Sequence, residues 1–168
     1  LGVNYDQAWP SLLQSRINKM EASYRVINAG VSGDTTSGGI SRLPRLLKKY
    51  SPEILILELG GNDGLRGTSL KAIEKNLSDM INSAQSSNIT VLLVGVQLPP
   101  NYGTLYTKGF ENIFSGLAKE HGLDLIQGSL KTMVNEGLMQ SDGIHPNVSG
   151  HQQIENIIWE RLNKYLEK

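Results

Sequence analysis

The sequence contains no cysteine, no long hydrophobic run and no excess of either charge. Without cysteine the chain can form no disulfide, offer no thiol nucleophile and hold no thiolate-bound metal, and its redox compartment stays open. Sixteen basic residues balance sixteen acidic ones, so no overall field attracts nucleic acid or an anionic membrane. No apolar run approaches the roughly 20 residues of a transmembrane helix. We therefore expect a small, neutral or locally recognised substrate.

Phosphate-binding motifs are also missing, although the chain has 18 glycines. No Gly-x-x-x-x-Gly-Lys-Ser/Thr segment occurs, and no Gly-x-Gly-x-x-Gly segment opens a helix after a strand. Nucleotide binding is therefore not expected, and we expect no cofactor of any kind.

Alternating apolar patterns predict β-α units that build a parallel sheet. With 168 residues, 39% of them hydrophobic, the chain has the size of one domain, and we expect residues 1–168 to form it. The expected strands are residues 24–29, 54–59, 90–96 and 123–126. The expected helices are residues 8–20, 40–50, 70–86, 107–121 and 150–166. Pro44 lies inside the second of these helices and is expected to kink it or delay its start.

Glycine-rich and polar loops follow the first three predicted strands, at residues 30–36, 60–64 and 97–103. Ligands of open parallel sheets bind beyond the carboxyl ends of the strands. We therefore expect these three loops, together with a later loop around Asp142 and His145, to reach one edge of the sheet.

Asp142 and His145 stand three residues apart in the segment Ser-Asp-Gly-Ile-His-Pro. An aspartate that accepts a hydrogen bond from one imidazole nitrogen leaves the other nitrogen to take a proton from a nucleophile. The pair therefore supplies the acid and the base of a hydrolytic triad.

Two residues are candidate donors to an oxyanion. Gly33 has no side chain to block its backbone N–H, and Asn62 offers a side-chain amide on a glycine-flanked turn. Either residue alone could simply be a turn former. Their occurrence with Asp142 and His145 favours an acyl-transfer site.

These residues resemble three of the four sequence blocks of the SGNH (GDSL) hydrolases. Further segments are similar to the branch of multifunctional acyl-CoA thioesterase I, lysophospholipase and arylesterase: residues 8–10, 42–44, 58–67 and 98–103. The resemblance covers essentially the whole chain and implies a three-layer α/β/α sandwich with a flavodoxin-like parallel sheet.

The resemblance also implies roles for individual residues. His145 would be the general base, Asp142 would orient it, and Gly33 and Asn62 would line the oxyanion hole. Substrate contacts are expected from a further set of residues: Asp63, Leu98, Pro99 and Tyr102. The implied substrate is a small acyl ester or thioester, hydrolysed through an acyl-serine.

The family's nucleophilic serine has no counterpart in this sequence. It belongs to a Gly-Asp-Ser-Leu block at the end of the first central strand, and Leu1-Gly2 aligns just beyond that block. Ser32 lies on the oxyanion loop and Ser141 only neighbours Asp142 in sequence, so neither suits the role. Because loss of a central strand would leave apolar sheet edges unpaired, at about 1 to 3 kcal/mol per buried group, we expect some 10 to 40 further upstream residues in the natural protein. The chain as printed is then expected to be inactive.

Other functions stay open at this stage. Asp142, His145 and His151 could in principle bind a metal, but six residues and Pro146 separate the histidines, so we expect no metal site. A carbohydrate O-deacetylase on the same fold, or a binding module without turnover, would carry the same residues. We expect a monomer. The compartment is undecided, although frequent export in this branch favours the periplasm or secretion.

Overall fold

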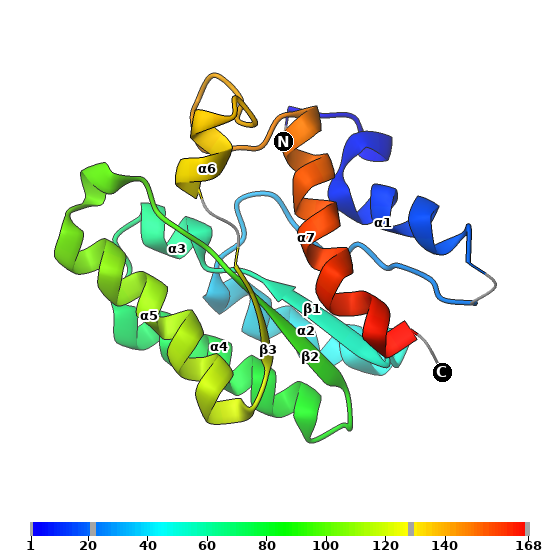
Figure 1. Ribbon diagram of the computed structural model, residues 1–168. Helices are drawn as coiled ribbons and strands as arrows, with labels where there is room; N and C mark the ends of the chain where they lie inside the picture. Colours follow the sequence, from blue (N-terminus) through cyan, green and yellow to red (C-terminus); the bar gives the residue numbers. More distant parts are fainter. Residues whose placement is uncertain (1, 21–22, 128–129, 167–168) are drawn as a thin grey trace. The chain divides into compact units, whose positions relative to one another are not determined.

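The computed structural model describes residues 2–20, 23–127 and 130–166 (Figure 1). The chain divides into two units. One contains residues 1–29 and 128–168, and the other contains residues 30–127. Each unit is described by itself below. The longer continuous unit holds the sheet, and the other unit holds the first and last helices.

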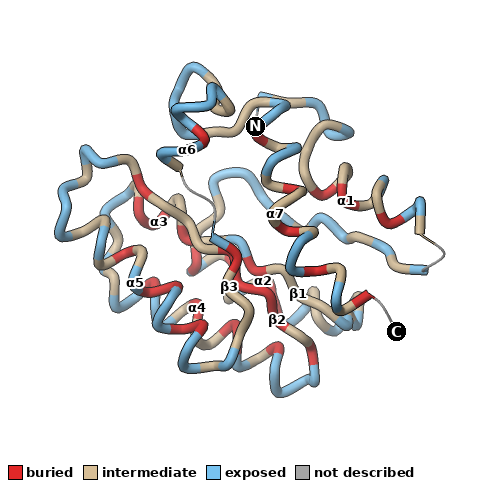
Figure 2. The backbone as a smooth tube through the Cα atoms, viewed as in Figure 1, coloured by how far each residue is buried: buried red, intermediate tan, exposed pale blue. Residues whose placement is uncertain are grey.

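A three-stranded parallel sheet forms the centre of the unit of residues 30–127. Its strands are β1 (Ile54–Glu58), β2 (Thr90–Gly95) and β3 (Asp124–Gln127), in the order β1-β2-β3. Leu57 pairs with Leu93, and Leu93 with Leu125, so the register is in phase across the sheet. These strands confirm three of the four predicted strands. As expected for the middle strand of a parallel sheet, β2 is buried at four consecutive residues (Figure 2).

Helices cover this sheet through one hydrophobic core. They are α2 (Thr36–Tyr50), α4 (Leu70–Gln85) and α5 (Thr104–His121). Two short elements, α3 (Gly61–Leu65) and the 3-10 helix η2 (Pro100–Tyr102), follow β1 and β2. The core includes fully buried residues of α4, β2 and α5: Ile73, Leu77, Ile81, Leu93, Phe110 and Phe114. The rings of Phe110 and Phe114 meet edge to face with centroids 5.3 Å apart.

Helix α2 begins four residues earlier than predicted. Thr35 caps it by accepting a hydrogen bond from the Gly38 N–H, and this cap starts the helix at Thr36. Pro44 lies inside the helix, which continues to Tyr50. The expected delay at Pro44 is therefore wrong, because the cap at Thr35 determines the start.

The second unit contains η1 (Tyr5–Gln7), α1 (Trp9–Ile17), α6 (Leu130–Asn135) and α7 (Val148–Leu166). Helices α1 and α7 are in contact, and buried apolar residues lie on both, including Leu13, Ile17 and Ile158. Arg16 of α1 forms an ion pair with buried Glu155 of α7 at 3.0 Å. The two ends of the described chain are joined in one unit by this helix pair.

Residues 24–29 do not form the predicted strand. Within the described part of the chain no strand pairs with them, and the side-chain amide of Gln14 contacts their backbone at Tyr24 and Val26. Gln14 Oε1 accepts from Val26 N–H at 2.6 Å, and Gln14 Nε2 donates to the Tyr24 carbonyl at 3.2 Å. The branched residues Val26 and Ile27 gave the strand signal, but a strand exists only where a neighbouring strand pairs with it.

No described helix is both long enough and apolar enough to cross a membrane. The carboxyl ends of β1 and β2 lead directly into α3 and into the segment 97–103. These two connections are the ones in which the sequence predicts site residues.

Candidate active site

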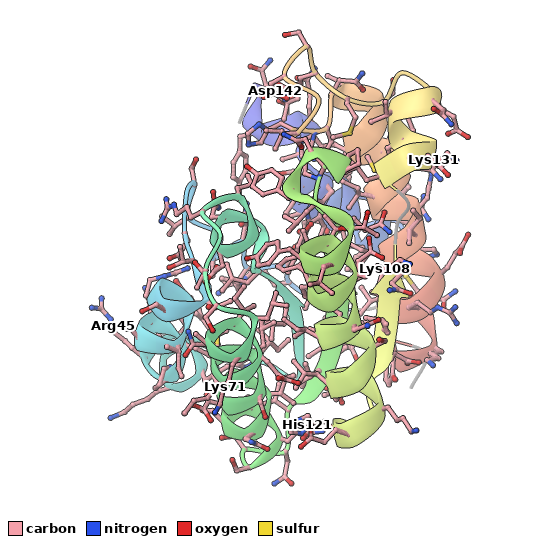
Figure 3. The ribbon with its side chains drawn as sticks, turned by 90° about the vertical axis from the view of Figure 1, so that its left-hand side faces the viewer. Arg45, Lys71, Lys108, His121, Lys131 and Asp142 are labelled. Carbon is pink, nitrogen blue, oxygen red and sulfur yellow. The ribbon has the colours of Figure 1, made fainter. Side chains whose placement is uncertain are left out.

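Asp142 and His145 form a hydrogen-bonded pair on the loop of residues 141–147, hereafter the dyad loop (Figure 3 labels Asp142). The distance from Asp142 Oδ2 to His145 Nδ1 is 2.7 Å. The other carboxylate oxygen accepts from the backbone N–H groups of Ile144 and His145, at 2.9 and 3.0 Å. The carboxylate thus folds its own loop and orients the imidazole at the same time.

The Asp142 carboxyl has a strongly altered acidity. Hydrogen bonds from the His145 backbone, the His145 ring and the Ile144 backbone hold its pKa well below the usual range of an aspartate. The side chains of Asp142 and His145 are 44% and 40% exposed, so water and a substrate can reach them. Asp142 is an anion at all physiological pH values, and His145 is left with Nε2 as the ring nitrogen that can accept a proton.

Backbone contacts hold the dyad loop in place at both ends. Gln140 N–H donates to the His145 carbonyl at 2.7 Å, and the Gln140 side chain donates to the Pro146 carbonyl at 2.8 Å. Asn147 accepts from Gly150 N–H in the first turn of α7. Its own amide donates to the carbonyls of Gly137 and Met139. Asn147 therefore joins the start of α7 to the segment that precedes the dyad.

Gly33 and Asn62 lie in the other unit, on the two loops 30–35 and 60–66, hereafter the donor loops. Gly33 has φ +76°, which favours glycine, and no atom lies within 4 Å of the position of a Cβ there. Among the described residues its N–H has no hydrogen-bond acceptor, while its carbonyl accepts from Arg66 at 3.2 Å. An N–H with open space beside it can donate to a substrate oxygen.

Asn62 contacts the loop that carries Gly33. Its Nδ2 donates to the Asp34 carbonyl at 2.9 Å, which fixes the orientation of the amide. An amide nitrogen carries two hydrogens, so the second remains for another acceptor. The structure brings the two predicted oxyanion donors onto adjoining loops of one unit.

Asp63 is almost fully buried and contacts the first residue of α2. Its oxygens accept from the Thr36 N–H at 2.8 Å and from the Thr36 hydroxyl at 2.7 Å, and its exposed fraction is 2%. Asn76 of α4 donates to the same hydroxyl at 3.0 Å. The expected direct contact of Asp63 with substrate does not fit this burial. The geometry instead makes Asp63 the anchor between the donor loops.

The other expected substrate contacts differ in exposure. Leu98 is 5% exposed and belongs to the core, so it packs inside the unit and does not wall a cleft as expected. Pro99 and Tyr102 are partly exposed, and the Tyr102 hydroxyl donates to the Leu65 carbonyl at 3.1 Å. Neighbouring Leu105 is 91% exposed. An apolar surface beside this loop would therefore come from Pro99, Tyr102 and Leu105.

Ser32, Ser141 and His151 are the remaining residues that the sequence brought into question as a nucleophile or a metal ligand. Both serines are exposed loop residues. His151 lies on α7, where its Nδ1 accepts from the Trp9 N–H at 3.4 Å. Within residues 2–20, 23–127 and 130–166, no group of three or more histidine, aspartate or glutamate side chains could hold a metal ion.

Thr36, Asn76, Asp34 and Arg42 were not predicted as members of the site. One usable signal was present, because Asp34 and Thr35 are typical residues for the start of a helix. The contacts of Thr36 with Asp63, of Asp34 with Asn62 and of Asn76 with Thr36 span 27, 28 and 40 positions, and no local pattern marks such contacts.

Comparisons with known proteins add independent information. The family model of GDSL-like lipases and acylhydrolases matches residues 1–153. Esterase TesA of Pseudomonas aeruginosa is 40% identical over 167 residues, which cover 99% of this chain and 83% of that protein. Thioesterase 1/protease 1/lysophospholipase L1 of Escherichia coli K12 is 40% identical over 141 residues, 83% of this chain and 66% of that protein.

A crystal structure of TesA is also similar to this chain. Its TM-score is 0.91 at 39% identity, and the match covers 98% of this chain and 92% of that one. This similarity confirms the predicted α/β fold with a parallel sheet.

Proposed function

Because the chain belongs to the GDSL-like lipase and acylhydrolase family and has the SGNH hydrolase fold, we propose that the protein hydrolyses acyl esters and thioesters by way of an acyl-serine. Relatives named as an esterase and as a thioesterase and lysophospholipase support this substrate class. Hydrolysis of lysophospholipids and aryl esters belongs to the same proposal.

The observation that carries the proposal is the 2.7 Å contact between Asp142 Oδ2 and His145 Nδ1. This contact holds the imidazole with Nε2 available as a general base. The anionic Asp142 also stabilises the imidazolium that forms when His145 takes a proton. A binding module without turnover would need neither property.

In the proposed reaction the nucleophile is the serine that the family resemblance implies. Its hydroxyl oxygen attacks the carbonyl carbon of the substrate while His145 Nε2 takes the hydroxyl proton. The imidazolium then gives that proton to the leaving alkoxide or thiolate, and the acyl-serine remains. Water attacks the acyl-serine by the same route and releases the fatty acid. No metal or organic cofactor enters these steps.

Gly33 and Asn62 are the proposed oxyanion donors. The charge that develops on the carbonyl oxygen would be stabilised by the Gly33 N–H and by the second hydrogen of the Asn62 amide. The free Gly33 N–H and the fixed orientation of Asn62 support this assignment.

The test compares the 168-residue chain with the natural full-length protein on p-nitrophenyl esters, from acetate to long acyl chains, and on an acyl-CoA. We expect activity in the full-length protein alone. Activity in the 168-residue chain would show that a nucleophile within residues 1–168 suffices. Full-length protein that is silent on both substrate sets would contradict the proposed function, and turnover of acetylated sugars alone would indicate an O-deacetylase.

A further inference from the structure

Each polar group of Asp34, on the donor loop 30–35, contacts a different neighbour. Oδ2 accepts from Arg42 Nε and Nη2 at 3.0 and 2.6 Å, and Oδ1 accepts from the Thr35 N–H at 3.0 Å. The Asp34 N–H donates to the Val31 carbonyl at 3.1 Å, which closes the turn that contains Gly33. The conformation of Gly33 is thus fixed from the residue that follows it.

The same residue also contacts the second oxyanion donor. The Asp34 carbonyl is the acceptor of the Asn62 amide. A small rotation of the peptide plane of Asp34 would therefore move the Asn62 amide, and a shift of the loop would move the adjoining Gly33 N–H. Both donors depend on one residue, although they are 29 positions apart in the sequence.

The side chain of Asp34 is held in place by residues of α2. The Asp34 side chain is only 12% exposed, and Arg42, two turns into α2, holds it with two nitrogens. Gly38 lies directly beneath the carboxylate, where an added Cβ would come within 1.9 Å of Asp34 Oδ1 and 3.1 Å of Cγ. The glycine is thus required for space, because any larger residue would displace the carboxylate.

From these contacts we infer that Asp34, held by Arg42 and seated on Gly38, is the positioning residue that sets both oxyanion donors at once. The inference rests on the proposed function, since Gly33 and Asn62 are oxyanion donors only in an acyl transfer. Asp34 touches no reacting atom. It acts through the Gly33 peptide and the Asn62 amide.

The decisive variant is Gly38→Ala, because it displaces Asp34 without removing any of its polar groups. Alanine favours helices more than glycine, so a purely structural role of Gly38 in α2 predicts no loss from the backbone. The matched control is Gly116→Ala on α5, an exposed helical glycine with no atom within 4 Å of its Cβ position. A second variant, Arg42→Gln, removes the guanidinium that holds the Asp34 carboxylate. The variant Arg42→Lys keeps the positive charge at this position.

Two readouts on the natural full-length protein test the inference. For hydrolysis of p-nitrophenyl butyrate, we expect Gly38→Ala to lower kcat on the order of 10- to 100-fold with KM within about twofold, because misplaced donors weaken transition-state binding alone. We expect about a tenfold loss in Arg42→Gln, partial recovery in Arg42→Lys, and no change in Gly116→Ala. In ¹⁵N NMR spectra, the Gly33 backbone amide and the Asn62 side-chain amide should shift in Gly38→Ala and stay in place in Gly116→Ala.

The outcomes separate the inference from the function on which it rests. If the unaltered protein hydrolyses esters and Gly38→Ala keeps its kcat, the inference is wrong and the function stands. Unmoved Gly33 and Asn62 signals in Gly38→Ala also overturn the inference, whatever the rate. If the unaltered protein hydrolyses nothing, the proposed function fails first, and the catalytic role of Asp34 fails with it.

Discussion

The dyad loop and the donor loops are built in opposite ways. Every contact between Asp142 and its partners spans two or three residues, and both members of the dyad are about two-fifths exposed. The donor loops are joined by the Asn62–Asp34 contact across 28 positions and by the Thr36–Asp63 contact across 27 positions, and Thr36 and Asp63 are 0% and 2% exposed. The proton-transfer pair is thus a local structure on the surface, whereas the oxyanion donors are fixed from the interior.

This difference predicts different responses to mutation. Changes in the dyad loop should remove chemistry and leave stability almost untouched. Changes behind the donor loops should affect both.

The largest expected effect is on turnover in His145→Ala. The variant removes the general base, so we expect kcat of the full-length protein to fall on the order of 10⁴- to 10⁶-fold with an unchanged melting temperature. The assay is hydrolysis of p-nitrophenyl butyrate, with His121→Ala at the end of α5 as the control. Activity above one per cent of the unaltered protein would remove His145 from the mechanism.

A smaller loss is expected in Asn62→Ala. Removal of one oxyanion donor should lower kcat about 10² to 10³-fold, and KM should change little because the bond forms only in the transition state. Asn82→Ala, on the exposed side of α4, controls for loss of an amide. A negligible effect on kcat would show that Asn62 serves only the loop through its bond to Asp34.

Stability should distinguish the two regions most directly in Asp63→Ala. The variant leaves the buried Thr36 N–H and hydroxyl without their acceptor, and we expect a loss of about 3 kcal/mol in the free energy of unfolding. Urea unfolding measures this value. Asp142→Ala is the comparison and should leave stability nearly unchanged, since its partners reach water. Equal losses in the two variants would contradict the contrast between the loops.

The smallest expected effect is a dependence of the free energy of unfolding on pH, caused by His151 in the unit that carries the dyad. Burial lowers the pKa of His151 below its usual value of 6.5, and the neutral ring accepts from the Trp9 N–H. Below pH 6.5 the unfolded chain therefore binds a proton that the folded chain refuses, and the free energy of unfolding should decrease as the pH falls from about 7 toward the folded pKa. The same urea series in His151→Gln should show a flatter slope in this window. An identical slope would exclude His151 as the cause.

Much of the fold was predictable, because helices and buried strands repeat apolar residues at fixed intervals. The strands β1, β2 and β3 and the five longer helices follow their predicted segments to within a few residues. One predicted strand did not form. The range 24–29 has the composition of a strand, but no strand among the described residues pairs with it, and Gln14 bonds to its backbone at Tyr24 and Val26. Composition does not specify a partner.

The candidate site divides in the same way. The sequence by itself determined the Asp142–His145 pair, because residues three apart on one turn meet whatever the rest of the chain does. Only the tertiary structure decided that Asp63 faces Thr36, that Leu98 is in the core and that Asp34 orients Asn62. Those contacts depend on which loops adjoin after β1, α2 and β2 have packed together, and burial of the shared core, not local sequence, selects that arrangement.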